Sequence, residues 1–148
     1  MVQVLVLWLA RWGHVLSAAL WVGGYAALVL GVLPLMRRGH TPALSVLAER
    51  LVQVMTGAGV STMVFGLLLV TRTRGFASFG RGEWGGIVIS CIVIAVLLFG
   101  IGDGALRPAI RRYAASGELG RAGAAATLGF ALAVLAVGLM TRALYATT

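Results

Sequence analysis

Acidic residues, cysteine and histidine are all scarce in this chain of 148 residues. It has four acidic residues, one cysteine and two histidines, and its twelve basic residues are all arginine. The single cysteine, Cys91, excludes a disulfide within the chain. The sequence holds no paired carboxylates, Ser/His/Asp set, CxxC motif or phosphate-binding loop. Hydrolytic and nucleotide chemistry are therefore disfavoured.

The chain has many more apolar residues, and fewer charged residues, than a soluble domain. The composition is 60% hydrophobic and 11% charged, with a mean hydropathy of +1.00, whereas about a quarter of the residues in a soluble domain are charged. Four apolar runs are long enough to cross a bilayer core of about 30 Å. The sequence predicts an all-α fold, an integral membrane antiparallel four-helix bundle in one domain, 1–148. The expected helices cover about 4–36, 42–71, 84–102 and 122–144.

The arginines lie in short gaps between these runs, which is typical of membrane topology rather than of nucleic-acid binding. We expect membrane lipids, and no nucleic acid, as partners. Seven arginines fall in the first and third gaps: Arg37, Arg38, Arg50, Arg107, Arg111, Arg112 and Arg121. The other side has Arg72, Arg74, Arg81 and Arg142, with Arg11 as a possible fifth. The positive-inside rule predicts a multi-pass protein of a bacterial-type inner (cytoplasmic) membrane, with both termini outside.

His14 is the only histidine inside an apolar run. An ionisable side chain in a bilayer is costly, so His14 is a hypothesis for a functional site. Trp21 follows two helical turns later on the same face, and Arg11 lies one turn before. An equally weighted alternative is a histidine that only bonds to a neighbouring helix, because one histidine cannot complete a metal or haem site. His40 is expected to be a solvated loop residue at the other end of this helix.

Small residues mark the helix faces that should pack closely. Ala58, Thr62 and Gly66 are spaced by four in the second run, which lets a neighbouring helix approach. In the last run a heptad-like series predicts the interior face, with Leu128, Leu132, Leu135 and Leu139 toward lipid. That series is Ala122, Ala126, Gly129, Ala133, Ala136 and Met140.

A weak internal repeat links the two halves of the chain. The segment 34–38, Pro-Leu-Met-Arg-Arg, matches 108–112, Pro-Ala-Ile-Arg-Arg, 74 residues later. This indicates two helical hairpins in the same orientation. The alternative is that proline and arginine end many membrane helices alike.

The run from His14 to Gly24, followed by Leu33-Pro34 and then Arg37-Arg38, resembles the first helix of CopD-like copper-resistance membrane proteins. That superfamily in turn resembles the HemJ-type protoporphyrinogen oxidases, which are four-helix proteins of similar length. The match covers roughly 12–38; elsewhere only the helix count and loop charge agree. The resemblance implies a four-helix membrane bundle that associates with copper or haem b, with the motif's histidine at His14. The histidine- and acid-containing patch and the helix-3 basic residue of the HemJ type are missing, so protoporphyrinogen oxidation is not expected.

We therefore expect a membrane protein that binds haem b or copper in the outer half of the bundle, for electron transfer or copper handling. His14 would be the anchoring ligand, with Met63 or Met140 as a second ligand, because haem iron accepts histidine with methionine. Trp21 shares the face of His14, and Arg11 is placed to pair with a haem propionate. A homodimer that supplies His14 twice is another route. The alternative is a cofactor-free structural subunit of a larger membrane complex. If the protein is an enzyme, we expect a membrane oxidoreductase.

Overall fold

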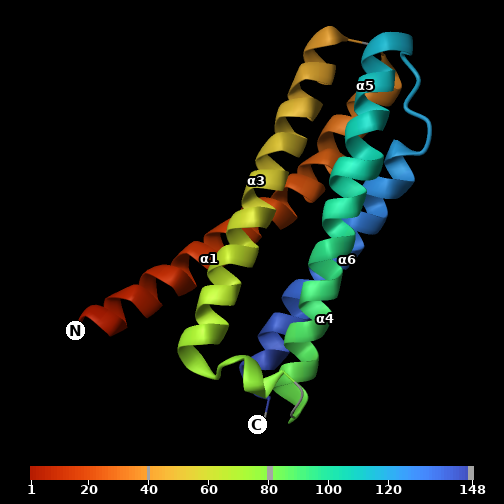
Figure 1. Cartoon of the computed structure of the whole chain (residues 1–148). Helices are drawn as coiled ribbons and strands as arrows, with labels where there is room; N and C mark the ends of the chain where they lie inside the picture. Colours follow the sequence, from red (N-terminus) through yellow and green to blue (C-terminus); the bar gives the residue numbers. More distant parts are fainter. Residues whose placement is uncertain (40, 80–81, 147–148) are drawn as a thin grey trace.

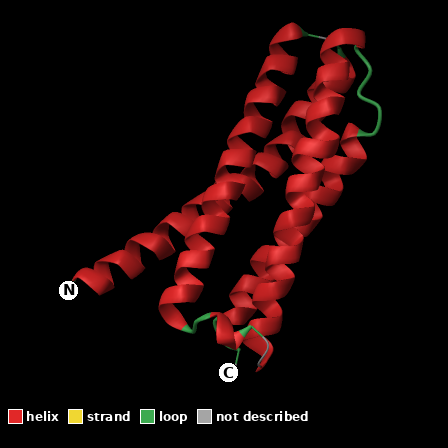
Figure 2. Ribbon diagram, in the orientation of Figure 1, coloured by secondary structure: helices red, strands yellow, loops and turns green. Residues whose placement is uncertain are grey.

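The computed structural model describes residues 1–39, 41–79 and 82–146, in which every regular element is a helix (Figures 1 and 2). Four helices are long and apolar enough to cross a membrane: Val2–Arg38, Pro42–Thr73, Gly82–Ser116 and Ala122–Ala143. The first consists of α1 (Val2–Ala27), η1 (Leu28–Val32) and α2 (Leu33–Arg38). The second is α3 (Pro42–Thr73), and a short η2 (Phe76–Ser78) follows it. The third consists of α4 (Gly82–Phe99), η3 (Gly100–Leu106) and α5 (Arg107–Ser116), and the fourth is α6 (Ala122–Ala143). His40 lies outside the described residues.

Apolar side chains cover the outside of these helices as well as the inside. Leu30 on the first helix is 73% exposed, Val96 on the third 60%, and Leu135 on the fourth 51%. A helix that is apolar all round has no stable place in water unless it is buried. The surface is therefore of the kind that lipid, rather than water, would cover.

The third helix is longer than the sequence predicted. We expected it to end near Gly102, with the charged residues from Asp103 to Arg121 in the gap that follows, but it continues through η3 and α5 to Ser116. A proline inside a helix lacks an N–H and its ring meets the carbonyl four residues earlier, here that of Gly104. The wider π-helical turns of η3 lie at this point and let the helix pass Pro108. The helix ends where Gly117 adopts φ +75° in the left-handed region, a conformation that favours glycine.

The first helix passes its proline in the same way. The π-helical η1 ends just before Leu33, and Pro34 lies in the first turn of α2. The carbonyl that the Pro34 ring would meet belongs to Leu30, inside η1. Each half of the chain thus has a widened segment followed by a proline and an arginine pair. The two prolines are 74 residues apart.

The fourth helix is buried on the face that the sequence predicted. Its buried residues are Ala122, Ala126, Gly129 and Ala133, and Ala136 and Met140 are partly buried. Leu128 and Leu135 are exposed, as expected. Leu132 and Leu139, which we expected to face lipid, are partly buried against the core. The buried stripe is wider than the heptad series because α6 packs against both α1 and α4.

Glycines allow α1 and α3 to lie close together, and this is the most extensive contact between two elements. A Cβ at Gly59 would lie 2.9 Å from the ring of Trp21, and one at Gly24 would collide with Met55. Below this contact α1 diverges, and its N-terminal end lies well away from the other helices (Figure 1). The first turns of α1 therefore expose a series of large apolar side chains: Val2, Val4, Leu5, Trp8 and Leu9.

Candidate functional site

His14 bonds to the backbone of the neighbouring helix. It lies on α1, partly buried, and its Nδ1 is 2.9 Å from the carbonyl oxygen of Thr62 on α3. A carbonyl oxygen only accepts, so Nδ1 carries a hydrogen and donates it. In the neutral ring the lone pair is then on Nε2. Within the described part of the chain, Nε2 has no hydrogen-bond partner.

Two glycines make room for this bond. A Cβ at Gly66, one turn after Thr62, would lie 3.0 Å from Cε1 of His14 and 3.2 Å from Nδ1. A Cβ at Gly13 would lie 2.7 Å from the ring of Phe65. The stripe of small residues on α3 is thus the surface that admits α1, and it lets the imidazole reach a main-chain carbonyl.

Trp21 and Met63 border the same helix contact. The Trp21 ring is buried against Gly59 and lies 5.0 Å, centroid to centroid, from the ring of Phe99 on α4. Met63 is partly buried and packs against the core. It follows Gly59 by four residues and precedes Gly66 by three, so it shares the face of α3 that meets α1. Trp21 therefore packs in the α1–α3 contact two turns along α1 from His14, and Met63 belongs to the adjoining surface.

The two other residues predicted for this site have surroundings that differ from those of His14. Met140 packs in a separate cluster with Ile87, Cys91 and Ala146. Arg11 is exposed and, among the described residues, has no ion-pair or hydrogen-bond partner. Of the two methionines, Met63 is the one on the helix face that contacts α1 around His14.

The donor set limits which groups this site fits. The described residues contain no group of three or more His, Cys, Asp and Glu side chains that could hold a metal ion. A closed structural metal site, which takes four such ligands, is therefore not formed by the described part of one chain. A haem iron needs only two axial ligands from protein, and imidazole with thioether is an established pair. The residues around His14 fit that requirement by type.

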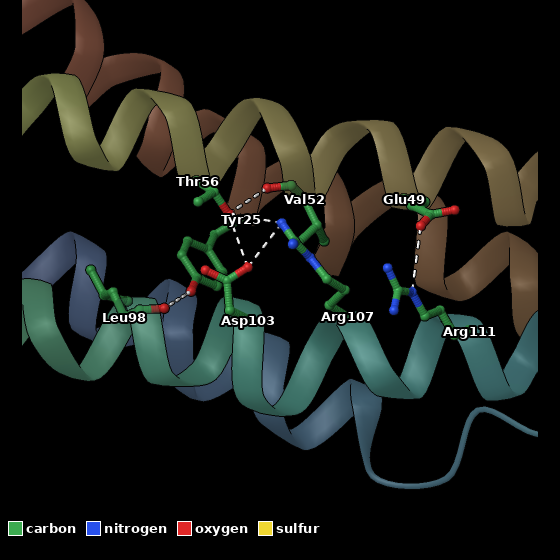
Figure 3. Close-up of polar contacts among 8 residues, drawn as sticks. All are labelled: Tyr25, Glu49, Val52, Thr56, Leu98, Asp103, Arg107 and Arg111. Carbon is green, nitrogen blue, oxygen red and sulfur yellow. Dashed lines mark hydrogen bonds and ion pairs between the residues drawn. The ribbon is translucent and has the colours of Figure 1, made fainter.

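A second polar cluster joins the third helix to α3 (Figure 3). Asp103 of η3 and Arg107 of α5 form an ion pair of 2.9 Å, four residues apart. The Thr56 hydroxyl lies 3.3 Å from Asp103 Oδ1 and 3.0 Å from the Val52 carbonyl, and accepts from Arg107 at 3.5 Å. One helical turn further on, Arg111 pairs with Glu49 at 3.6 Å. These contacts tie the widened segment of the third helix to α3.

Buried tyrosines join the first helix to the third. The Tyr25 hydroxyl donates to the Leu98 carbonyl at 2.9 Å (Figure 3), and the Tyr113 hydroxyl donates to the carbonyls at the end of α2, Met36 at 3.0 Å and Gly39 at 2.9 Å. The last carbonyls of a helix have no partner within it, so Tyr113 acts as a cap for α2.

Sequence reasoning missed this second cluster. We placed Asp103 and Arg107 in the gap after the third apolar run, together with the other charged residues up to Arg121. Their spacing of four is the spacing of an ion pair on one helix face, which was the available signal. Thr56 carried no comparable signal, since a single threonine in an apolar helix usually bonds to its own backbone.

Comparisons with models of protein families, with curated proteins and with solved structures found no match to this chain. The likeness of residues 12–38 to CopD-like proteins stays a prediction.

Proposed function

We propose that this protein binds haem b, or copper, through His14 in the outer half of an antiparallel four-helix bundle of a bacterial-type cytoplasmic membrane, with both termini outside. The bond from Nδ1 to the Thr62 carbonyl is the observation that supports this most. Histidines that bind metals usually donate their other ring N–H to a carbonyl or carboxylate, which orients the ring and fixes its tautomer. The imidazole of His14 has this arrangement, with Nε2 left for a ligand.

The proposed outer position follows from the charges at the two ends of the helices. Thr62 and Gly66 lie within two to three turns of Arg72, at the end of the helices where the gaps hold fewer arginines. The positive-inside rule assigns that end to the outside. His14 contacts α3 at this level, so the site belongs to the outer half.

Haem b fits the donor set more closely than copper. Copper handling would favour several soft or imidazole ligands along a path, and the α1–α3 contact offers His14 and Met63. A haem would be held by His14 together with either Met63 or the His14 of a second copy. Arg11, one turn outward, is a cation available to a propionate. When bound, haem supplies one-electron chemistry, which would suit electron transfer.

A cofactor-free structural subunit is the second candidate. The exposed apolar turns at the start of α1 favour it, because they leave an unpartnered surface for a helix of another protein. In that case the His14–Thr62 hydrogen bond only holds two helices together.

Visible absorption and metal analysis of protein extracted in mild detergent separate the two candidates. We expect a haem or copper signal in the wild type that is lost in His14→Ala and retained in His40→Ala. Met63→Leu should alter the signal and Met140→Leu, the matched methionine, should leave it unchanged. A signal that changes in Met140→Leu but not in Met63→Leu would identify Met140 as the second ligand. A colourless, metal-free wild type, or a His14→Ala variant that keeps its cofactor, would reject the ligand role and leave the structural subunit.

A further inference from the structure

A cavity of about 260 Å³ lies between the third helix and the start of α6, apart from His14. Its charged lining consists of Arg112 and Arg121. Small residues form the rest of the wall, among them Gly104, Ala109 and Ala125. The absence of larger side chains there leaves room between the helices for a group that is not part of the protein.

The two arginines of this cavity are uncompensated. Both are exposed, so the cavity has its positive charge at the surface of the molecule. Nearby Arg107 and Arg111 pair with Asp103 and Glu49, but Arg112 and Arg121 form no ion pair with any described residue. A guanidinium binds phosphate or carboxylate through two parallel N–H groups, so two guanidiniums at one cavity are suited to an anion.

The start of α6 adds to this positive field. Its N-cap residue is Arg121, and no side chain caps the first N–H groups. The N-terminal end of a helix carries a partial positive charge. The cavity with its two arginines thus lies at the positive end of the fourth helix.

Exposed apolar residues lie further along both helices that border the cavity. Leu97 precedes Gly104 by seven residues on the third helix, and Leu128 follows Ala125 by three on α6. Both leucines are exposed. A ligand with an anionic head and a hydrocarbon tail would match the charge at the cavity and these exposed apolar residues.

We propose that this cavity binds the phosphate group of an anionic membrane lipid, held between Arg112 and Arg121, with the acyl chains along the Leu97 and Leu128 surface. A phosphate group is the chemistry that the site recognises, and free phosphate is its other source. Binding of a lipid here would join the end of the third helix to the start of α6.

Native mass spectrometry of the full chain in detergent, with phosphatidylglycerol, phosphatidylcholine or inorganic phosphate added, tests the site. We expect one phosphatidylglycerol per chain to be retained, and phosphatidylcholine to be lost. R112Q/R121Q should weaken phosphatidylglycerol binding at least about tenfold. R38Q/R50Q, which removes two exposed arginines of the same end outside the cavity, should weaken it less than about twofold.

A cavity-filling variant keeps every charge. A125L should abolish retention while the net charge stays the same, which a diffuse surface attraction cannot explain. Equal losses in the two double-arginine variants, or undiminished binding by A125L, would overturn the proposal. Displacement of the lipid by millimolar inorganic phosphate would overturn the lipid assignment and make free phosphate the ligand.

Discussion

At the scale of single residues, the closest contacts between helices depend on glycines that face large side chains. Tyr25 is fully buried, with an exposed fraction of 0%, and its ring lies against Gly129 of α6. The Tyr25 hydroxyl reaches the Leu98 carbonyl from this position. Gly129 thus sets the distance between α1 and α6 and, with it, the position of the tyrosine.

Gly129→Ala should destabilise the protein, because the added methyl would collide with the Tyr25 ring. Overpacking a tight contact typically costs about 1–3 kcal/mol. Gly138 lies on the same helix and faces open space, so Gly138→Ala is the matched control. It should be neutral, or more stable by up to about 1 kcal/mol, through helix propensity. Thermal unfolding in detergent measures both, and equal effects would contradict the assigned face of α6.

The sequence identified His14 but not its partner. A histidine in an apolar run stands out by type, whereas the acceptor is a main-chain carbonyl, and every residue has one. The stripe of Ala58, Thr62 and Gly66 did predict a close helix contact on α3. The sequence could not tell that α1 would fill it, or that Met63 would lie nearer to that contact than Met140. Those outcomes depend on how each helix is rotated about its own axis. A stripe of small side chains is compatible with several such rotations.

At the scale of elements, the three prolines explain both the success and the error in the helix bounds. Pro42 begins α3 as expected, although the Thr41 side chain makes no capping hydrogen bond. Pro34 and Pro108 instead lie within continuous helices, because a widened segment precedes each. Proline thus begins one helix and lies inside two others. Local sequence does not separate these cases, since the widening is held by contacts such as that of Thr56 with Asp103.

Hydrogen–deuterium exchange tests the continuation of the third helix. We expect slow exchange for the amides of 109–113, because they lie in α5 and Tyr113 is buried against α2. The segment 117–121, which connects α5 to α6, should exchange faster by at least about tenfold. Mass spectrometry of peptides from each segment measures this. Equally fast exchange in both segments would contradict the continuous helix and support the loop that we predicted after Gly102.

At the scale of the whole molecule, the number of long apolar helices was predictable from composition and periodicity alone. The four apolar runs correspond to four long apolar helices among the described residues, because length and hydropathy decide this feature and side-chain detail does not. The divergence of α1 from the other helices was harder to predict from the sequence. A run from Val2 to Arg38 exceeds a bilayer core, but the sequence does not say whether the excess protrudes or tilts.

Cysteine labelling tests the proposed orientation. Cys91 is the only cysteine in the sequence, so Cys91→Ser supplies a background without other thiols. In that background Tyr145→Cys should react with an impermeant reagent in intact cells, and Ser116→Cys should react only after lysis. Both positions are exposed, so access depends on the side of the membrane. Reaction of Ser116→Cys alone from outside would invert the topology.

The first helix is longer than a bilayer is thick. Its 37 residues rise about 55 Å, against a hydrocarbon core of about 30 Å. A tilt of about 40°, the upper end for membrane helices, does not absorb this difference. Trp8 and Trp12 stack at a centroid distance of 6.3 Å near the diverging end, and indole rings favour the headgroup layer. In the proposed membrane-spanning arrangement, hydrophobic mismatch would act on the angle of α1: a thick bilayer would favour an upright α1 against α3, and a thin one would favour an α1 that lies along the membrane surface.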